Sequence, residues 1–184
     1  MEISKVTVRS ILNKHKRRDE WFLDEYSVNP YYGCPFACIY CYTRGGKYGK
    51  APDQLSAKIN APEVLDRQLR RRASKKEYGF IAVGTSTEPY MPVEKELGLT
   101  REVLEVIRYY RFPVHVLTKS DLVLRDIDLL LDLSGRVILP EDLKGKVSGS
   151  LVTLSILALD ISLSKVFEPG APSFLGKLRG LSLS

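Results

Sequence analysis

All three cysteines of the chain lie within eight positions, where Cys34, Cys38 and Cys41 form a C-x3-C-x2-C pattern. An odd number of cysteines argues against a closed set of disulfides and leaves metal ligation or redox chemistry. Three thiolates on one tight loop can bind a metal centre from one side and leave one coordination position open. An iron–sulfur cluster with one iron free for a small molecule fits this spacing best.

Two other interpretations of the cysteines stay open at this point. A structural zinc ion normally takes four protein ligands, so zinc would need a fourth ligand from His15, His115 or a carboxylate. Unligated thiols are the remaining alternative.

Tyr40 precedes the last cysteine, and C-x3-C-x-aromatic-C resembles the signature of the radical S-adenosylmethionine (SAM) superfamily. The resemblance implies that the three cysteines hold a [4Fe–4S] cluster, that SAM chelates the fourth iron, and that Tyr40 packs against the cluster. One electron, delivered by a donor such as ferredoxin or flavodoxin, would cleave SAM to methionine and a 5′-deoxyadenosyl radical. That radical abstracts a hydrogen atom from the substrate.

A closer likeness lies further along the chain. The segments "GTSTEPYMPVEKELGLTRE", "VLTKSDLVLRDIDLL" and "FEPGAPS" resemble the spore photoproduct lyase-like branch, also labelled DNA repair photolyases. The likeness implies that Thr87 and Glu88 meet the SAM amino group, that Lys119 contacts its carboxylate, and that Ser155 reaches its ribose. Each has a simpler alternative. Thr87 and Glu88 could bond only to loop backbone groups, Lys119 could be a surface cation, and Ser155 could make a core hydrogen bond.

Two departures from this branch change what we expect of the reaction. The namesake enzyme uses an additional cysteine near the end of the second strand as a hydrogen-atom donor, and Thr85 falls at about that place. Dipyrimidine repair by that mechanism is therefore not expected, although other lyase or hydrogen-abstraction chemistry is. The family barrel also continues beyond the point where this chain stops. We therefore expect a C-terminally shortened member that turns over slowly alone, with a remnant that binds the cluster without turnover as an alternative.

The elements that must position these residues alternate along the chain. Strands are expected near "EYSVN", "YGFIAVGTS", "PVHVLTK" and "SGSLVTLSILAL", with helices over 62–73, from Thr100, and in "VLRDIDLLLDL". This alternation predicts an α/β fold with a parallel sheet, whose active site lies at the carboxyl ends of the strands. The resemblance implies a partial (β/α) barrel with about four strand-helix units. We expect a basic extension over 1–25 and a radical SAM domain over 26–184.

The last expected strand is apolar on both faces, which is typical of a central strand. With no later strand beside it, one edge would be unpaired. Self-association or a complementing chain at that edge is therefore expected.

Composition and charge bound the remaining expectations. The chain is 44% apolar and 27% charged, which predicts one globular domain, and it has neither a signal-peptide pattern nor a stretch long enough to cross a membrane. We expect a cytoplasmic protein. The net charge of +6, with "KHKRR" at 14–18 and "RQLRRRASKK" at 67–76, suits phosphate contacts. A nucleic-acid-binding module with a structural metal is the alternative function, and an ion-paired surface would give the same pattern.

Overall fold

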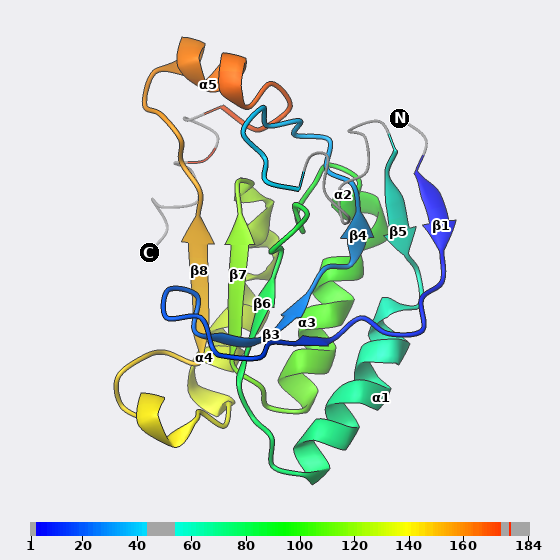
Figure 1. The fold of residues 1–184 in the computed structure, drawn as a ribbon, viewed down its shortest axis with the longest axis vertical. Coiled ribbons are helices and arrows are strands. Elements are labelled where there is room, and N and C mark those ends of the chain that lie inside the picture. Colours follow the sequence, from blue (N-terminus) through cyan, green and yellow to red (C-terminus); the bar gives the residue numbers. More distant parts are fainter. Residues whose placement is uncertain (1–2, 44–53, 174–176, 178–184) are drawn as a thin grey trace.

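Two β-sheets form the frame of the protein (Figure 1). The computed structural model of the chain describes residues 3–43, 54–173 and 177. The larger sheet has the strand order β2-β3-β6-β7-β8, and the smaller one has the order β1-β5-β4. The strands are β1 (Ser4–Val6), β2 (Asn13–Lys14), β3 (Asp24–Val28), β4 (Tyr31–Tyr32), β5 (Ser56–Lys58), β6 (Phe80–Val83), β7 (Val114–Thr118) and β8 (Ser150–Leu154). The helices are α1 (Ala61–Ser74), α2 (Glu94–Leu97), α3 (Leu99–Tyr109), η1 (Asp121–Asp126), α4 (Ile127–Arg136), η2 (Glu141–Leu143) and α5 (Ile161–Phe167), of which η1 and η2 are 3-10 helices.

Strands β3, β6, β7 and β8 pair in parallel and follow one another in chain order. Right-handed crossovers between successive neighbours bring every connecting helix to the same face of a sheet. Helices α3 and α4 accordingly lie behind the sheet in Figure 1, and α1 lies beside α3. The predicted α/β class with a parallel sheet is confirmed, and the carboxyl ends of these four strands meet at one edge.

Alternating side chains on the strands build the core against these helices. Ile81, Val83, Val114 and Val116 are fully buried and belong to one apolar cluster with residues of α1 and α3. Leu65 and Leu69 of α1 and Leu104 and Ile107 of α3 also belong to this cluster. The helical spacing that predicted these two helices therefore reflects one buried stripe on each.

Two elements differ from the expectation. The helix expected in "VLRDIDLLLDL" begins as the 3-10 helix η1, and α4 starts only at Ile127. The reason is the buried Asp126, whose carboxylate accepts hydrogen bonds from Arg101, Arg125 and the Tyr90 hydroxyl and so fixes the turn before α4. The last strand ends at Leu154, so Ser155 follows the strand instead of lying inside it.

The described part of the N-terminal segment, residues 3–25, packs onto the body of the protein. β1 pairs in parallel with β5, and β2 pairs antiparallel with β3. Ile11 and Leu12 are buried, and both of their backbone N–H groups donate to the Gln68 side chain of α1. The basic run at 14–18 therefore starts in a strand of the larger sheet.

One edge of the larger sheet stays open in the described residues. β8 pairs with β7, and no described strand pairs with its other edge. None of the helices in the described part has the length and apolar character needed to cross a membrane.

Candidate functional site

A cavity of about 260 Å³ lies at the carboxyl ends of the parallel strands. The cysteine loop after β4, the loop after β6, the end of β7 and the residue after β8 all contribute to its wall. All eight residues that the sequence singled out line it, namely Cys34, Cys38, Tyr40, Cys41, Thr87, Glu88, Lys119 and Ser155. Residues up to 121 positions apart in the sequence are thus brought together, as the strand order predicts.

The three cysteines are free thiols on one wall of this cavity. Burial raises the pKa of Cys34 to about 11, although hydrogen bonds from the backbone of Phe36 and Glu88 oppose it. Burial also raises the pKa of Cys38, while the charge of Lys119 lowers it. Within the described residues, no three His, Cys, Asp or Glu side chains converge as ligands of a metal ion.

The segment 167–170 holds the cysteine loop in place. The backbone N–H of Ile39 donates to Phe167 O at 2.9 Å, and the N–H of Gly170 donates to Phe36 O at 3.0 Å. A Cβ atom at Gly170 would lie 2.2 Å from Pro35 O, so only glycine permits this close approach of two backbones. The "FEPGAPS" segment is therefore a structural partner of the cysteine loop.

Thr87 and Glu88 lie side by side in the chain but differ in their bonding. Thr87 Oγ1 is buried and has no hydrogen-bond partner in the described part of the chain. Both oxygens of Glu88 are occupied, because they accept from the backbone N–H groups of Tyr90 (3.0 Å) and Lys119 (2.9 Å) and from the Thr118 hydroxyl. Burial raises the pKa of Glu88. Glu88 thus binds backbone groups of the loops, as its simpler alternative predicted. The Thr87 hydroxyl, in contrast, is available to a ligand as donor and as acceptor.

Lys119 lies at the centre of a polar network and has a side chain that is 16% exposed. Its Nζ donates to Ser155 Oγ at 2.5 Å and to the Tyr40 hydroxyl at 3.2 Å, and lies 2.8 Å from Glu168 Oε1. Burial would lower the pKa of Lys119, but the hydrogen bonds to Glu168 and Tyr40 outweigh it and raise the pKa. Lys119 is therefore a paired, charged group of the site and no solvated surface lysine.

Glu168 is the main residue of this site that sequence reasoning did not single out. It is buried, its Oε1 accepts from the Tyr40 hydroxyl, and its Oε2 accepts from Lys177 Nζ at 2.5 Å. Burial would raise the pKa of Glu168, but hydrogen bonds from Lys119, Lys177 and Tyr40 lower it. Two signals in the sequence could have indicated Glu168. It lies inside the "FEPGAPS" segment, and a lysine at the end of a buried strand, such as Lys119, needs a carboxylate as counter-ion.

Tyr40 and Thr85 have roles of their own in the cavity wall. The Tyr40 ring is half exposed, and Lys119 Nζ lies 5.7 Å from its centroid. Burial raises the pKa of the Tyr40 hydroxyl to about 12. Thr85 Oγ1 accepts from Asn29 Nδ2 at 3.0 Å, and its carbonyl accepts from the Tyr42 hydroxyl. Tyr42 and Thr85 thereby close one side of the cavity.

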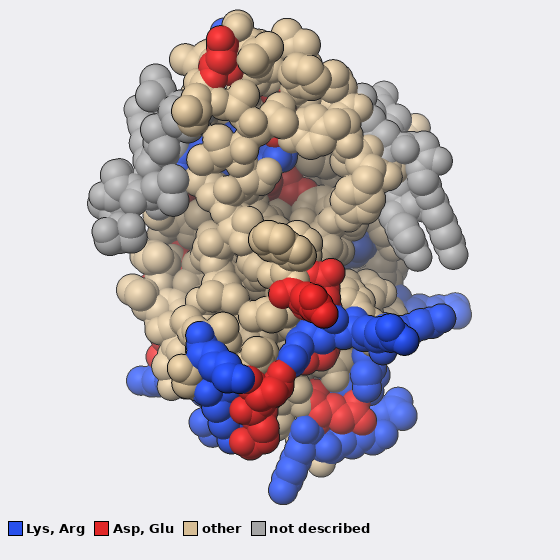
Figure 2. Space-filling model, turned by 60° about the vertical axis from the view of Figure 1, so that its left-hand side comes forward, with Lys and Arg blue, Asp and Glu red and all other residues tan. Residues whose placement is uncertain are grey.

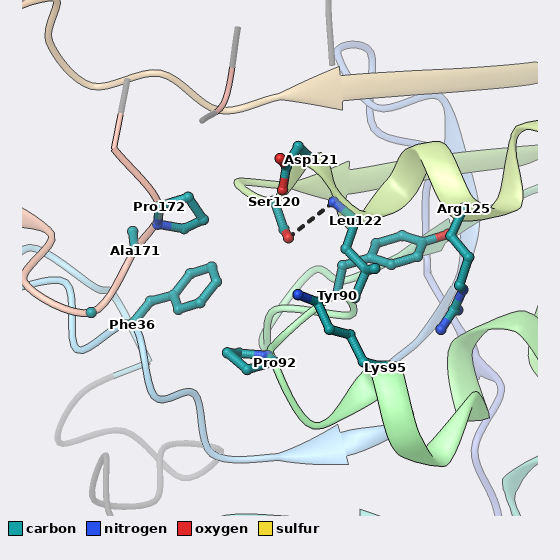
Figure 3. Close-up of a pocket in the computed structure, with 11 residues that line it drawn as sticks. Phe36, Tyr90, Pro92, Lys95, Ser120, Asp121, Leu122, Arg125, Ala171 and Pro172 are labelled. Atoms are coloured by element: carbon teal, nitrogen blue, oxygen red, sulfur yellow. Dashed lines mark hydrogen bonds between the residues drawn. The ribbon is translucent and has the colours of Figure 1, made fainter. Parts of the chain in front are cut away.

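A larger neighbouring cavity of about 490 Å³ lies on the other side of Phe36, which lines both cavities (Figure 3). Figure 3 shows Phe36 and Pro172 facing Lys95 and Arg125 across it, with Tyr90 behind. Arg125 already pairs with Glu94 and Asp126. This cavity has no thiol in its wall, so its greater size does not make it the better candidate site.

Several residues of the two basic runs form ion pairs with carboxylates. Figure 2 shows Lys and Arg interleaved with Asp and Glu over the lower part of one face. Lys14 and Arg72 both pair with Glu77, Arg70 pairs with Asp66, and Arg18 pairs with Asp142. Such pairing reduces the excess positive potential available to a phosphate backbone, and the nucleic-acid partner stays a prediction.

Comparison with known proteins finds relatives of similar sequence. An uncharacterized protein of Methanocaldococcus jannaschii is 33% identical over 177 residues, which cover 94% of this chain and 58% of that protein. Uncharacterized proteins of Mycobacterium tuberculosis and Mycobacterium bovis are 30% identical over 155 residues, or 80% of this chain and 42% of each relative. The chain thus spans about half the length of the curated relatives it matches. No family model and no solved structure matches the chain.

Proposed function

We propose that this chain is a radical SAM protein, in which Cys34, Cys38 and Cys41 hold a [4Fe–4S] cluster and SAM binds beside it. The observation that carries the proposal is the shared cavity. The residues that the resemblance assigns to the cluster and those that it assigns to SAM come from four separate segments, and all of them line one space. A chance likeness of short motifs gives no reason for that convergence.

The donor set at this cavity suits an iron–sulfur cluster. Three free thiols share one loop, and a cluster takes one thiolate per iron, so the thiols need not converge on a single ion. The orphaned Thr87 hydroxyl supplies a second reason, because a buried hydroxyl without a partner is costly unless a ligand satisfies it. The amino group of SAM could provide the missing hydrogen bond.

When bound and reduced, the cluster would supply one electron that cleaves SAM to methionine and a 5′-deoxyadenosyl radical. The protein's part is to bind and orient SAM. Lys119 uses its three N–H bonds on Ser155, Tyr40 and Glu168. A SAM carboxylate would replace one hydroxyl partner of Lys119, and the exchange is favourable because hydrogen bonds between charged groups are the stronger ones.

The fold is compatible with this proposal. A parallel sheet in sequential order with its helices on one face is the arrangement expected of part of a (β/α) barrel. Tyr40 would shield the cluster from solvent, which helps to set its potential. An electron donor such as ferredoxin or flavodoxin would be the redox partner.

The test is SAM affinity after anaerobic reconstitution with iron and sulfide, measured by equilibrium dialysis. Wild type should bind SAM, and Lys119→Met should weaken binding at least about tenfold, because it removes one charge-assisted hydrogen bond of roughly 1.5–3 kcal/mol. Lys95→Met is the matched control, since Lys95 is an exposed lysine that lines the neighbouring cavity.

Three results are informative here. Iron content should be the same in all three proteins, so that the affinity change reports on SAM alone. Absence of SAM binding in iron-loaded wild type would contradict the proposed function. Equal affinity in Lys119→Met would remove Lys119 from the SAM site.

A further inference from the structure

Of the two histidines of the chain, His15 contacts the carboxylate of Asp24, and the charge of His115 also acts on it. His15 Nδ1 lies 3.0 Å from Asp24 Oδ2, and His15 Nε2 lies 3.0 Å from Ser27 Oγ. His115 binds the carbonyl oxygen of Phe22 through Nδ1 at 2.9 Å, and its ring lies 5.8 Å from the Phe22 ring. The segment before β3 is thus held by Asp24 and Ser27 at His15 and by His115 of β7 at Phe22.

Asp24 has one oxygen without a partner. The residue is 3% exposed, its Oδ2 pairs with His15, and its Oδ1 accepts no hydrogen bond in the described part of the chain. Burial raises the pKa of the Asp24 carboxyl, and the charge of His15 only partly offsets this. A buried carboxylate oxygen in this state is satisfied best by a donor that a ligand brings.

Asp24 forms part of the wall of a separate cavity of about 450 Å³. Its lining residues are His15, Asp19, Phe22, Asp24, Tyr42, Thr85 and Leu117. Two carboxylates and two aromatic rings therefore face this space, and none of the seven lining residues is a lysine or an arginine. Carboxylates and aromatic faces together are the surroundings that bind an organic cation.

His15 is the lining residue that pairs with Asp24, and the other charged neighbours of this cavity are directed elsewhere. Arg18 pairs with Glu25 and Asp142 and is not among the lining residues. Asp19 Oδ1 accepts from the backbone N–H groups of Trp21 and Phe22, which fixes its carboxylate at the rim. The cavity is thus acidic in a chain whose net charge is +6.

This cavity adjoins the cysteine cavity. Tyr42, Thr85 and Leu117 line both spaces. A molecule whose cationic end lay at Asp24 would therefore lie against side chains that also form the wall of the cysteine cavity.

We propose that the space around Asp24 is a binding site for the ammonium or amidinium group of a small molecule, with Asp24 Oδ1 as the principal acceptor and Asp19 and Phe22 beside it. The further statement that this molecule is the substrate rests on the proposed function, whereas the binding of a cation is independent of it.

A hydrolytic interpretation of the same residues is weaker. Asp24, His15 and Ser27 are connected in the order of a Ser-His-Asp triad. Ser27, however, is not among the residues that line the cavity, whereas Asp24 is, so the Ser27 hydroxyl does not face a ligand there. Ser27 and Asp24 instead hold the His15 ring in one orientation.

The two histidines make the site directly observable by NMR. We would titrate the full chain, as purified and before any iron or SAM is added, with benzylammonium and with its neutral counterpart benzyl alcohol. The histidine Cε1–H resonances are the readout, because the chain has only two histidines, of which His15 lines the cavity and His115 packs against Phe22, which lines it. Benzylammonium should shift both resonances and saturate, and benzyl alcohol should bind at least tenfold more weakly.

Variants assign the effect to the carboxylates. Asp24→Asn should weaken benzylammonium binding at least tenfold, and Asp19→Asn should weaken it a few-fold. Because Asp19 is exposed, Asp19→Asn decides the matter if Asp24→Asn fails to fold. Glu105→Gln, an exposed carboxylate on α3, should leave the titration unchanged.

Equal binding of the charged and neutral probes would overturn the proposal, as would wild-type affinity in both carboxylate variants. The experiment needs neither cluster nor SAM. A later failure to bind iron or SAM would therefore refute the proposed function and leave the cation site standing, and the reverse result would refute the cation site alone.

Discussion

Lys119 and Glu168 form the charged pair at the centre of the candidate site, and the lysine was predictable where the glutamate was not. Lys119 follows an apolar strand, so its place at the carboxyl end of β7 follows from the sequence pattern. Glu168 lies 49 positions later, in a segment whose path over the cysteine loop depends on two backbone hydrogen bonds and on Gly170. Such contacts have no sequence period, and only the folded chain reveals them.

His15 was considered only as a possible zinc ligand, and its contact with Asp24 was not predicted for a different reason. It lies inside the run "KHKRR", where composition favours a solvated cationic surface. In the structure its ring turns inward to Asp24 and Ser27, while Lys14 turns outward to Glu77. His15 directly follows β2, and its backbone N–H continues the pairing with β3 by donating to Glu25 O at 2.8 Å, so its side chain points to the face opposite to that of Lys14.

Lys58 provides a pH-dependent prediction at the residue scale. Its buried Nζ donates to Asn29 O at 2.6 Å and lies 3.9 Å from the Tyr32 ring centroid, and burial lowers the pKa of Lys58 to about 8. Between about pH 8 and about pH 10.4, the ordinary value for lysine, the unfolded chain binds more protons at this group than the folded chain does. The contribution of Lys58 to the free energy of unfolding should therefore rise with pH across this window.

Urea unfolding of wild type and Lys58→Met at about pH 7.5 and about pH 9.5 measures this contribution. The free energy of unfolding of wild type relative to the variant should increase by roughly 1–2 kcal/mol over that interval. Lys75→Met, an exposed lysine after α1, is the control and should show no such trend. A difference between wild type and Lys58→Met that is independent of pH would show that Lys58 is not desolvated.

At the scale of elements, the sequence predicted those parts that bury an apolar stripe. The strands β3, β6, β7 and β8 and the helices α1 and α3 are all found at the expected places. The three-stranded sheet was not predicted, because β1, β4 and β5 are only two or three residues long and contain as many polar as apolar side chains. Their pairing depends on contacts between distant segments, such as Ser4 with Ser56.

Strand β8 is the strand for which the sequence predicted an unpaired edge. It is the last strand of the larger sheet, and Val152 on it is 44% exposed. The following residues add further exposed apolar side chains, including Leu159 at 73% and Val166 at 63%. An unpaired edge next to apolar surface favours pairing with another chain.

We therefore predict that the isolated chain associates through β8. Its apparent mass in light scattering should rise above the 20.8 kDa of one chain as concentration increases. Val152→Lys should reduce this association, since a lysine on an edge strand opposes strand pairing. Tyr109→Lys, at an exposed residue of α3, should not. A protein that stays monomeric at every concentration would contradict the prediction.

At the scale of the whole molecule, the distribution of charge separates two surfaces. Lys14, Arg18, Arg70 and Arg72 of the basic runs form ion pairs with nearby carboxylates. The cavity around Asp24, in contrast, has two carboxylates and neither a lysine nor an arginine among its lining residues. Net charge alone pointed toward phosphate, and the local arrangement points toward a cationic ligand next to the cysteines. The chain covers 58% and 42% of two of its curated relatives, so its substrate is stated here only as a proposal.

The central claim is that three cysteines hold a cluster with one iron open to SAM. The most direct measurement is the EPR spectrum of the anaerobically reconstituted, dithionite-reduced chain, recorded with and without SAM and accompanied by the iron content. The proposal predicts about four irons per chain, loss of most of this iron when Cys34, Cys38 or Cys41 is replaced by Ala, and a spectrum that changes when SAM is added. A colourless protein that contains zinc, full iron in any single cysteine variant, or a spectrum that SAM leaves unchanged would contradict it.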